Sequence, residues 1–162
     1  GATGVELSAE LVQLLESATA YGAPDLAGRV TITLVEAGPR LLAAFPEDIS
    51  SATRTRLESI GIRVLVGAQV KAATADAFVL ADGSTLPATL KVWAAGVKGP
   101  DFLADFDGLE ASRSNQLVVR PTLQTTRDDA IYALGDCAAL TLPGAERPLP
   151  PTAQVAHQQA RT

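Results

Sequence analysis

The sequence is poor in the side chains that perform redox or metal chemistry on their own. It contains one cysteine (Cys137), one histidine (His157) and no methionine among 162 residues. A single cysteine excludes an internal disulfide and a dithiol–flavin relay within this chain. We therefore assign no catalytic nucleophile, acid or base, and we predict no metal site. For His157 a solvated helix position is favoured over a proton donor, and for Cys137 a packed small residue is favoured over a redox role.

Basic clusters and long apolar runs are missing as well, and their absence argues against a nucleic-acid partner and a membrane-spanning segment. The net charge is -5 and no group of Lys and Arg residues is seen, so a nucleic-acid partner is not expected. No apolar run approaches the length of a membrane span. Only 4% of the residues are aromatic although 47% are hydrophobic, so the core must be built from Ala, Val, Leu and Ile. Such a composition suits layered helices and strands.

The order of apolar patterns predicts an α/β fold. We expect a helix over 4–20, a strand over Val30–Val35, a helix from Pro46 to about Ile60, and a strand over Ile62–Val66. The first helix is expected to bury one face, made of Leu7, Leu11, Leu14, Leu15 and Ala18. The alternation of strands and helices indicates a Rossmann-like parallel sheet with crossover helices.

The rest of the chain is expected to contain shorter elements. Residues 69–86 alternate loosely and contain Asp82-Gly83, which predicts a small antiparallel β-meander. A strand over Leu90–Ala94 should follow, and the loop-rich residues 98–116 mark a domain boundary, so the predicted domains are 1–98 and 99–162. The second domain is expected to contain short strands over Leu117–Val119 and Ile131–Leu134, and a helix from Thr152 to the end of the chain.

Two features of the first domain suggest a dinucleotide site. Gly1-Ala2-Thr3-Gly4 matches the last four positions of G-x-G-x-x-G and leads into a helix, whose first N–H groups attract a pyrophosphate. Glu36 follows the Val30–Val35 strand, where an acid can accept hydrogen bonds from the adenosine ribose and disfavour a 2′-phosphate. Glu36 lies further from the glycines than the usual spacing of about 20 residues. A glycine-rich helix entry and a solvated strand-end acid remain the alternatives.

Two features of the second domain suggest a flavin site. Ile131-Tyr132-Ala133-Leu134 delivers Gly135 and Asp136 to a strand end, where the carboxylate could accept a hydrogen bond from a ribityl hydroxyl. Gln154 and Gln158 are four residues apart, so a helix would place both amides on one face. An amide there could bind a quinone carbonyl or the flavin edge, although a polar helix start is the simpler interpretation.

Five segments in this order resemble the type II NADH:quinone dehydrogenases, which belong to the FAD-dependent pyridine nucleotide-disulfide oxidoreductases. They are G-A-T-G-V-E-L, T-L-V-E-A-G-P-R-L-L, V-W-A-A-G-V, Y-A-L-G-D-C-A and T-A-Q-V-A-H-Q-Q-A. Together they cover essentially the whole chain and are far more specific than any one alone. The resemblance implies one Rossmann-like domain for FAD and another for NADH, with the NADH domain inserted into the FAD domain.

The resemblance also implies site residues. Residues 1–98 would be the NADH domain, and residues 99–162 the returning part of the FAD domain. The implied NADH contacts are Gly1, Gly4, Glu6, Glu36, Ala95 and Gly96. The implied flavin contacts are Gly135, Asp136, Ala153 and Gln154, with Gln154 and Gln158 on the quinone side.

The family pattern contains segments that this chain does not, namely the first FAD-binding strands, the strand before Gly1 and the C-terminal membrane-attaching segments. We therefore expect a fragment that holds FAD weakly and lacks a complete catalytic cycle. The implied parent is a cytoplasmic-face enzyme of the inner membrane that transfers a hydride from NADH to FAD and electrons to a quinone. It would contact the membrane only through segments absent here. An open sheet edge suggests a possible homodimer.

Two alternatives remain open. One is another reductase of the same superfamily, either a sulfide:quinone or a ferredoxin reductase, although sulfide oxidation would require paired redox cysteines. The other is a dinucleotide-binding module without catalysis.

Overall fold

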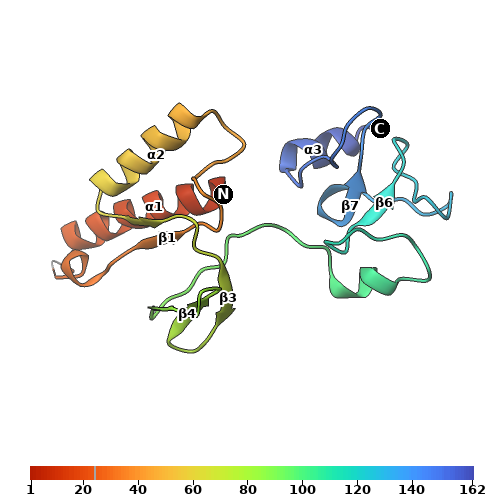
Figure 1. Cartoon of the computed structure of the whole chain (residues 1–162). Helices are drawn as coiled ribbons and strands as arrows, with labels where there is room; N and C mark the ends of the chain where they lie inside the picture. The colour runs from red at the N-terminus through yellow and green to blue at the C-terminus, as the bar shows by residue number, and fades with distance from the viewer. Residues whose placement is uncertain (24) are drawn as a thin grey trace. The chain divides into compact units, whose positions relative to one another are not determined.

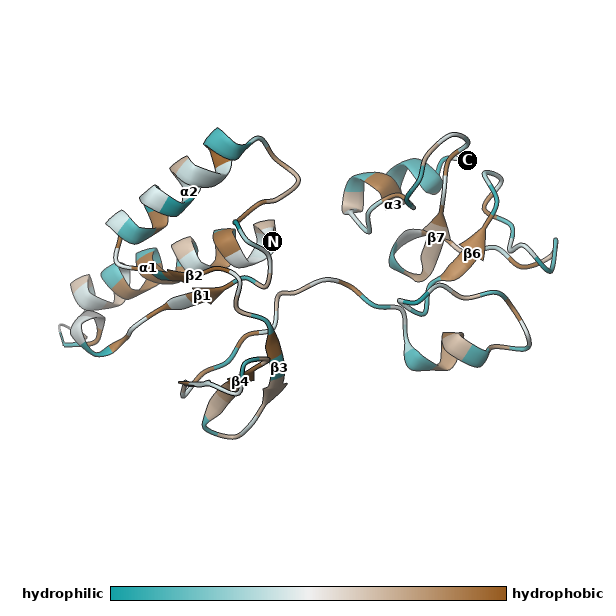
Figure 2. Ribbon diagram, in the orientation of Figure 1, coloured by the Kyte–Doolittle hydropathy of each residue, from teal (hydrophilic) through white to brown (hydrophobic). Residues whose placement is uncertain are grey.

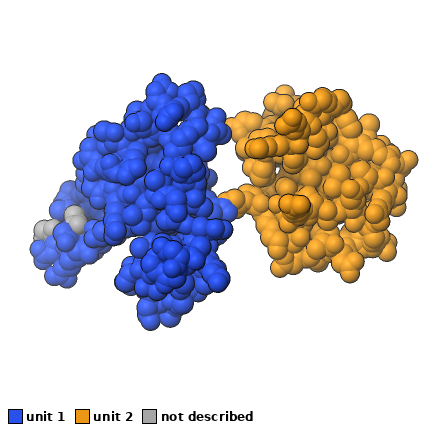
Figure 3. Space-filling view, viewed as in Figure 1, with its two compact units in different colours: residues 1–95 blue, residues 96–162 orange. Residues whose placement is uncertain are grey.

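The computed structural model describes residues 1–23 and 25–162, and these residues separate into two units with their own cores (Figures 1 and 3). Unit 1 is Gly1–Ala95 and unit 2 is Gly96–Thr162. Each unit is described below by itself. Within the described residues, no helix combines the length and the apolar character that crossing a bilayer requires.

Unit 1 begins with the predicted alternation of helices and strands. Its elements in order are α1 (Ala2–Ala20), the 3₁₀ turn η1 (Ala27–Arg29), β1 (Thr33–Val35), α2 (Glu47–Ser59) and β2 (Arg63–Leu65). Strands β1 and β2 pair in parallel, with Leu34 opposite Val64. A parallel pair requires a crossover connection, and α2 is that connection. The α/β fold class with a parallel sheet is therefore confirmed.

The core of unit 1 lies among β1, β2 and the two helices. Its buried residues are Leu41, Leu57, Ile62 and Val64. Glu47 and Asp48 begin α2, where acidic side chains favour the positive end of the helix dipole. In Figure 2, α2 alternates between polar and apolar colours along its length, as expected for a helix with one face on a core.

The predicted apolar face of α1 is only partly right. Leu11, Leu15 and Ala18 are half-buried, but Leu7 is 36% exposed and Leu14 is 63% exposed, and Val5, Ala9 and Val12 pack against the core. The helix contains two adjacent apolar stripes, and the smaller β-branched and Ala side chains allow α1 to approach the sheet more closely. Gly4 contributes to the same close approach, as described below.

The predicted meander is confirmed. Strands β3 (Val70–Ala73), β4 (Ala77–Leu80) and β5 (Thr85–Pro87) form an antiparallel three-stranded sheet. The Asp82 carboxylate accepts hydrogen bonds from the backbone N–H and the hydroxyl of Ser84, at 2.9 and 2.7 Å. These bonds stabilise the turn between β4 and β5 and lower the pKa of Asp82.

The strand predicted over Leu90–Ala94 is wrong, because these residues form no strand. The segment exposes large apolar side chains: Leu90 is 77% exposed and Trp93 is 63% exposed. Strand formation requires a hydrogen-bonded neighbour, and among the described residues none pairs with this segment. The aliphatic composition reflected a preference for strand structure, not an actual pairing.

Unit 2 is built around a second parallel pair. Its elements are η2 (Asp101–Asp105), β6 (Leu117–Val119), η3 (Gly135–Cys137), β7 (Ala138–Leu140) and the helix α3 (Ala153–Gln159). Strand β6 pairs with β7, with Val118 opposite Ala139, and β6 is strongly apolar (Figure 2). The buried residues of this core are Leu103, Leu109, Leu117, Val119, Leu123, Ala133, Ala138 and Leu140.

Two predictions for unit 2 are corrected. Residues Ile131–Leu134 are not a strand, since they form only an isolated bridge between Tyr132 and Gln124, and the strand follows the Gly-Asp turn as β7. The last helix ends at Gln159, before the end of the chain. The prediction of a strand at Leu117–Val119 is confirmed by β6.

Ser50 provides a test of the unit 1 core. Ser50 is 4% exposed, and its hydroxyl donates a 2.6 Å hydrogen bond to the backbone oxygen of Leu41, a residue that is also buried. We expect Ser50→Ala to lower the free energy of unfolding by about 1–3 kcal/mol, because the carbonyl would be left buried without its partner. Urea denaturation followed by circular dichroism measures the loss. Ser51→Ala, on the exposed side of the same helix, should change stability by less than about 0.5 kcal/mol.

Candidate functional site

The tip of α1 lies beside the end of β1. Gly1 caps the helix, and its nitrogen lies 2.9 Å from Oε2 of Glu36. A Cβ added at Gly1 would meet nothing within 4 Å. The first turn of α1 contains no acidic side chain that would offset the positive end of the helix dipole. These features suit the approach of an anion to the helix N-terminus.

Gly4 has a different role from Gly1. A Cβ at Gly4 would lie 3.2 Å from Cδ1 of Leu34 on β1 and 4.0 Å from Cβ of Ala94. The missing side chain therefore lets α1 pack closely on β1 and on the segment that leads to Ala95 and Gly96. Close packing of helix on strand is the role of the third glycine in G-x-G-x-x-G.

Glu36 is held at the strand end by two hydrogen bonds. Its Oε1 accepts from the backbone N–H of Gly38 at 2.9 Å, and its Oε2 accepts from Gly1. The Gly38 N–H, the Gly1 ammonium and the Ala37 N–H lower the pKa of Glu36, and they outweigh the partial burial that raises it. A carboxylate offers about four acceptor positions, so Glu36 can accept further hydrogen bonds from a sugar.

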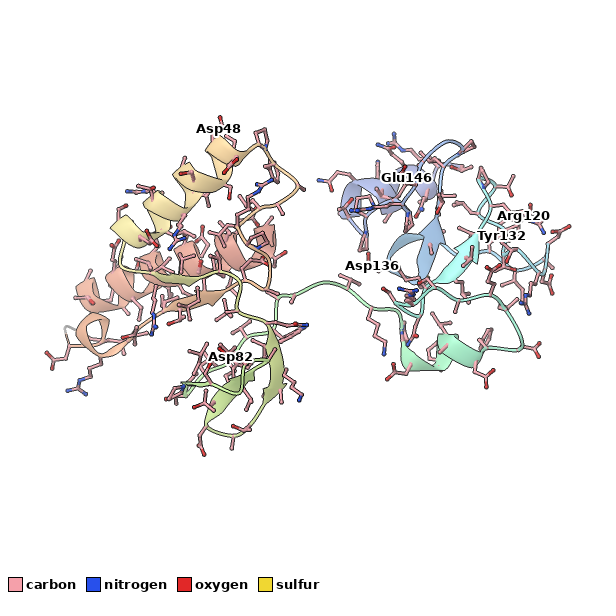
Figure 4. The ribbon with its side chains drawn as sticks, in the orientation of Figure 1. Asp48, Asp82, Arg120, Tyr132, Asp136 and Glu146 are labelled. Atoms are coloured by element: carbon pink, nitrogen blue, oxygen red, sulfur yellow. The ribbon has the colours of Figure 1, made fainter. Side chains whose placement is uncertain are left out.

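The Gly135-Asp136 turn is the corresponding feature of unit 2. Gly135 has φ +67°, in the left-handed region that favours glycine, and it starts η3 just before β7. The Asp136 side chain is exposed (Figure 4), so its carboxylate is available to a ligand hydroxyl. A Cβ at Gly135 would lie 3.5 Å from Cβ of Ala156, so α3 packs against this turn.

Helix α3 begins immediately after a side-chain cap. Thr152 Oγ1 accepts a 3.3 Å hydrogen bond from the backbone N–H of Val155, as expected for a threonine N-cap. Ala153 is the first residue of the helix, and Gln154 and Gln158 are exposed on it. Both amides are free to contact a molecule from outside unit 2.

Residues 1–160 match the pyridine nucleotide-disulphide oxidoreductase family. The chain belongs to this family. The match includes both glycine turns, Glu36 and α3, and it confirms the family predicted from the ordered sequence motifs.

Individual members of the pyridine nucleotide-disulphide oxidoreductase family match nearly the whole chain. The type II NADH:quinone oxidoreductase of Haemophilus influenzae is 46% identical, covering 99% of this chain and 36% of that protein. The type II NADH:quinone oxidoreductase of Staphylococcus aureus is 36% identical, covering 100% of this chain and 40% of that protein. The structure of NDH2 from Plasmodium falciparum in complex with NADH has a TM-score of 0.72 and 25% identity, covering 86% of this chain and 30% of that one. The chain thus spans less than half the length of these relatives.

The remaining predicted site residues of this family member are spread more widely. Ala95 and Gly96 are exposed, and Gly96 has φ +86°. Glu6 is exposed on α1, beyond its first turn. In unit 2, His157 is exposed, and the half-buried Cys137 donates a hydrogen bond from Sγ to the backbone oxygen of Leu134 at 3.1 Å. Among the described residues, no group of three or more potential metal ligands is seen.

Arg40 is a residue of the site region that the sequence motifs did not single out. Its guanidinium donates to the backbone oxygens of Leu42, Ala43 and Phe45, at 3.4, 2.9 and 2.9 Å. These bonds stabilise the loop between β1 and α2, in which Leu42 has φ 49°. Arg40 follows Glu36 closely in sequence, and three of its five N–H groups donate within the loop. The Gly-Pro-Arg sequence after the strand is the only signal that could have indicated it.

The lowered pKa of Glu36 predicts how stability depends on pH. A carboxylate with a depressed folded-state pKa stabilises the fold above its unfolded-state value and loses that contribution as pH falls through the folded-state value. The free-energy difference between the wild type and Glu36→Gln should therefore be constant between about pH 5 and pH 7. This free-energy difference should shrink as the pH falls below 4.5, the ordinary pKa of a glutamate carboxyl. Urea denaturation across this range measures it, and a difference that grows on acidification would contradict the assignment.

Proposed function

We propose that this chain is the dinucleotide-binding part, together with the returning flavin-binding part, of an FAD-dependent NADH:quinone oxidoreductase. The observation that supports it best is the position of Glu36 at the tip of α1, with its Oε2 2.9 Å from the nitrogen of Gly1. A helix start and an acidic strand end side by side are what binding a pyrophosphate and its adjacent ribose requires. The two similar type II NADH:quinone oxidoreductases support the same proposal.

In this proposal unit 1 binds NADH. The N–H groups at the start of α1 hold the pyrophosphate, with Gly1 leaving room for it and Gly4 bringing the helix onto β1. Glu36 accepts hydrogen bonds from the adenosine ribose, while its charge disfavours a 2′-phosphate. Glu6, Ala95 and Gly96 are further NADH contacts by the family pattern. The corresponding domain is residues 1–98.

Residues 99–162 supply contacts to the flavin and the quinone. The exposed carboxylate of Asp136 accepts a hydrogen bond from a ribityl hydroxyl, and the left-handed turn at Gly135 allows the backbone to come close. By the family pattern, Ala153 and Gln154 would contact the flavin, and Gln154 and Gln158 would offer amides to the quinone. When bound, FAD carries electrons from NADH to quinone, and these residues orient the flavin and exclude water from it.

The reaction is tested with the full-length protein and its flavin. Anaerobic addition of NADH should bleach the flavin spectrum, and a soluble ubiquinone or menaquinone analogue should restore it. Restoration by a ferredoxin but by no quinone would support a ferredoxin reductase instead. A protein that binds NADH without any flavin would favour the binding-module alternative.

The location and assembly of the protein are further parts of the proposal. We place the full-length enzyme on the cytoplasmic face of the inner membrane as a peripheral protein. For the 162-residue chain a homodimer is proposed, because β1 has a hydrogen-bonded neighbour only on its β2 side among the described strands. Fractionation of cells tests the first point, and light scattering of the purified protein tests the second. A monomer at all accessible concentrations would rule out the dimer.

A further inference from the structure

Two buried glutamine amides hold the Gly135-Asp136 turn from opposite ends. Gln159 Oε1 accepts a 2.7 Å hydrogen bond from the backbone N–H of Gly135, and Gln116 Nε2 donates a 3.0 Å hydrogen bond to the backbone oxygen of Asp136. Both side chains are almost fully buried, Gln159 at 7% and Gln116 at 9% exposure. Neither residue belongs to the surface that a ligand would contact.

The two bonds tie the turn to two different elements. Gln159 is the last residue of α3, and Gln116 immediately precedes β6. Helix α3 lies beside the turn, since a Cβ added at Gly135 would be in van der Waals contact with Cβ of Ala156, at 3.5 Å. The turn that presents the Asp136 carboxylate is thus fixed in its distance from the helix that presents Gln154 and Gln158.

We propose that Gln159 and Gln116 are positioning residues for the flavin contact of Asp136. The inference rests on the proposed function, because it assumes that Asp136 binds the ribityl chain. Gln159 sets the spacing between the turn and α3, and Gln116 sets the orientation of the Asp136 backbone. A buried donor or acceptor that loses its partner is strongly disfavoured, so the turn shifts when either amide is removed.

The two glutamines use opposite ends of their amides, so one substitution can distinguish their roles. Position 159 needs an acceptor and position 116 needs a donor. Glutamate has nearly the shape of glutamine but offers only acceptors when it is ionised. Gln159→Glu should therefore preserve the bond to Gly135, whereas Gln116→Glu places a carboxylate against the carbonyl of Asp136. A purely space-filling role would make the two substitutions equivalent.

The hydrogen bonds are measured first, in the 162-residue chain, by amide exchange in NMR spectra. The Gly135 amide should be protected in the wild type and in Gln159→Glu, and should exchange at least about tenfold faster in Gln159→Leu. Gln13→Glu, an exposed glutamine on α1, is the matched control and should leave the Gly135 amide unchanged. An unprotected Gly135 amide in the wild type, or one that is insensitive to Gln159→Leu, would overturn the proposal.

The positioning role is then measured in the full-length flavoprotein at mildly alkaline pH. FAD affinity should fall about tenfold in Gln159→Leu and Gln116→Glu, and stay within about twofold of wild type in Gln159→Glu. The flavin midpoint potential should shift in the same two variants only. If neither the FAD affinity nor the flavin midpoint potential changes in any of these variants, the positioning role is overturned and the proposed function still stands. A full-length wild type that holds no flavin would overturn both, although the exchange data would still report the bonds.

Discussion

Gly99→Ala is expected to lower the free energy of unfolding of unit 2 by about 4 kcal/mol or more, since steric conflict with fixed backbone is among the most destabilising mechanisms. A Cβ at Gly99 would lie 2.1 Å from the backbone oxygen of Asn115 and 2.7 Å from its carbonyl carbon. The two segments cannot easily separate, because the Gly99 N–H donates a 2.7 Å hydrogen bond to the backbone oxygen of Ser114. Asn115 itself has φ 55°, so its backbone has little freedom to relax.

Gly28→Ala is the matched control for this prediction. A Cβ at Gly28 would meet nothing within 4 Å, and its φ lies outside the left-handed region. Alanine there should leave stability within about 1 kcal/mol of wild type, or raise it slightly by restricting the unfolded chain. Urea denaturation of both variants gives the comparison. Equal stability of the two variants would mean that the contact between Gly99 and Asn115 is not maintained in solution.

Glu36→Gln is expected to remove most of the preference for NADH over NADPH. A hydrogen bond from a sugar hydroxyl to a charged acceptor contributes about 1.5–3 kcal/mol, so NADH affinity should fall about 10- to 100-fold. The same substitution removes a negative charge that repels a 2′-phosphate, so NADPH affinity should stay level or rise. Calorimetric titration of the 162-residue chain with each nucleotide measures both changes.

Glu16→Gln controls for the loss of charge alone. Glu16 is exposed near the far end of α1, away from the helix tip, and its replacement should leave the affinity for both nucleotides within about twofold of wild type. If Glu36→Gln behaves like Glu16→Gln, Glu36 does not contact the ribose. The proposal that unit 1 selects NADH would then fail.

The juxtaposition of Gly1 and Glu36 could be anticipated from the sequence, although 35 positions separate them. In a Rossmann-like unit the start of the helix and the end of the next strand meet at one edge of the sheet. Once the pattern indicated that fold, Gly1 and Glu36 were expected to lie close together. The antiparallel meander could also be predicted from the sequence, because Asp82-Gly83 defines its turn locally.

Features that depend on specific partners could not be anticipated. Leu90–Ala94 has the composition of a strand, but a strand forms only where another chain segment offers its backbone. The face of α1 was mistaken at Leu7 and Leu14 because periodicity finds apolar stripes without saying which of them meets the sheet. Leu7 and Leu14 have the larger side chains, yet Gly4 and Ala9 define the side that can approach β1 closely.

The buried amides were missed for a related reason. Gln116, Gln158 and Gln159 look alike in the sequence, and polarity predicts exposure for all three. Gln158 is exposed as expected, but Gln159 and Gln116 are buried because the backbone of one turn offers each of them a partner. Such pairing is a property of the assembled core and leaves no trace in spacing or composition.

Trp93 gives the chain a built-in optical reporter. It is the only tryptophan, its indole is 63% exposed, and its neighbour Ala94 lies against Gly4 at the start of α1. Its emission is therefore that of a water-exposed indole, and a blue shift or quenching would reveal any molecule that covers this end of unit 1. Reduced nicotinamide absorbs where tryptophan emits. NADH bound at the helix tip would therefore quench the Trp93 emission by energy transfer, and no added label is needed.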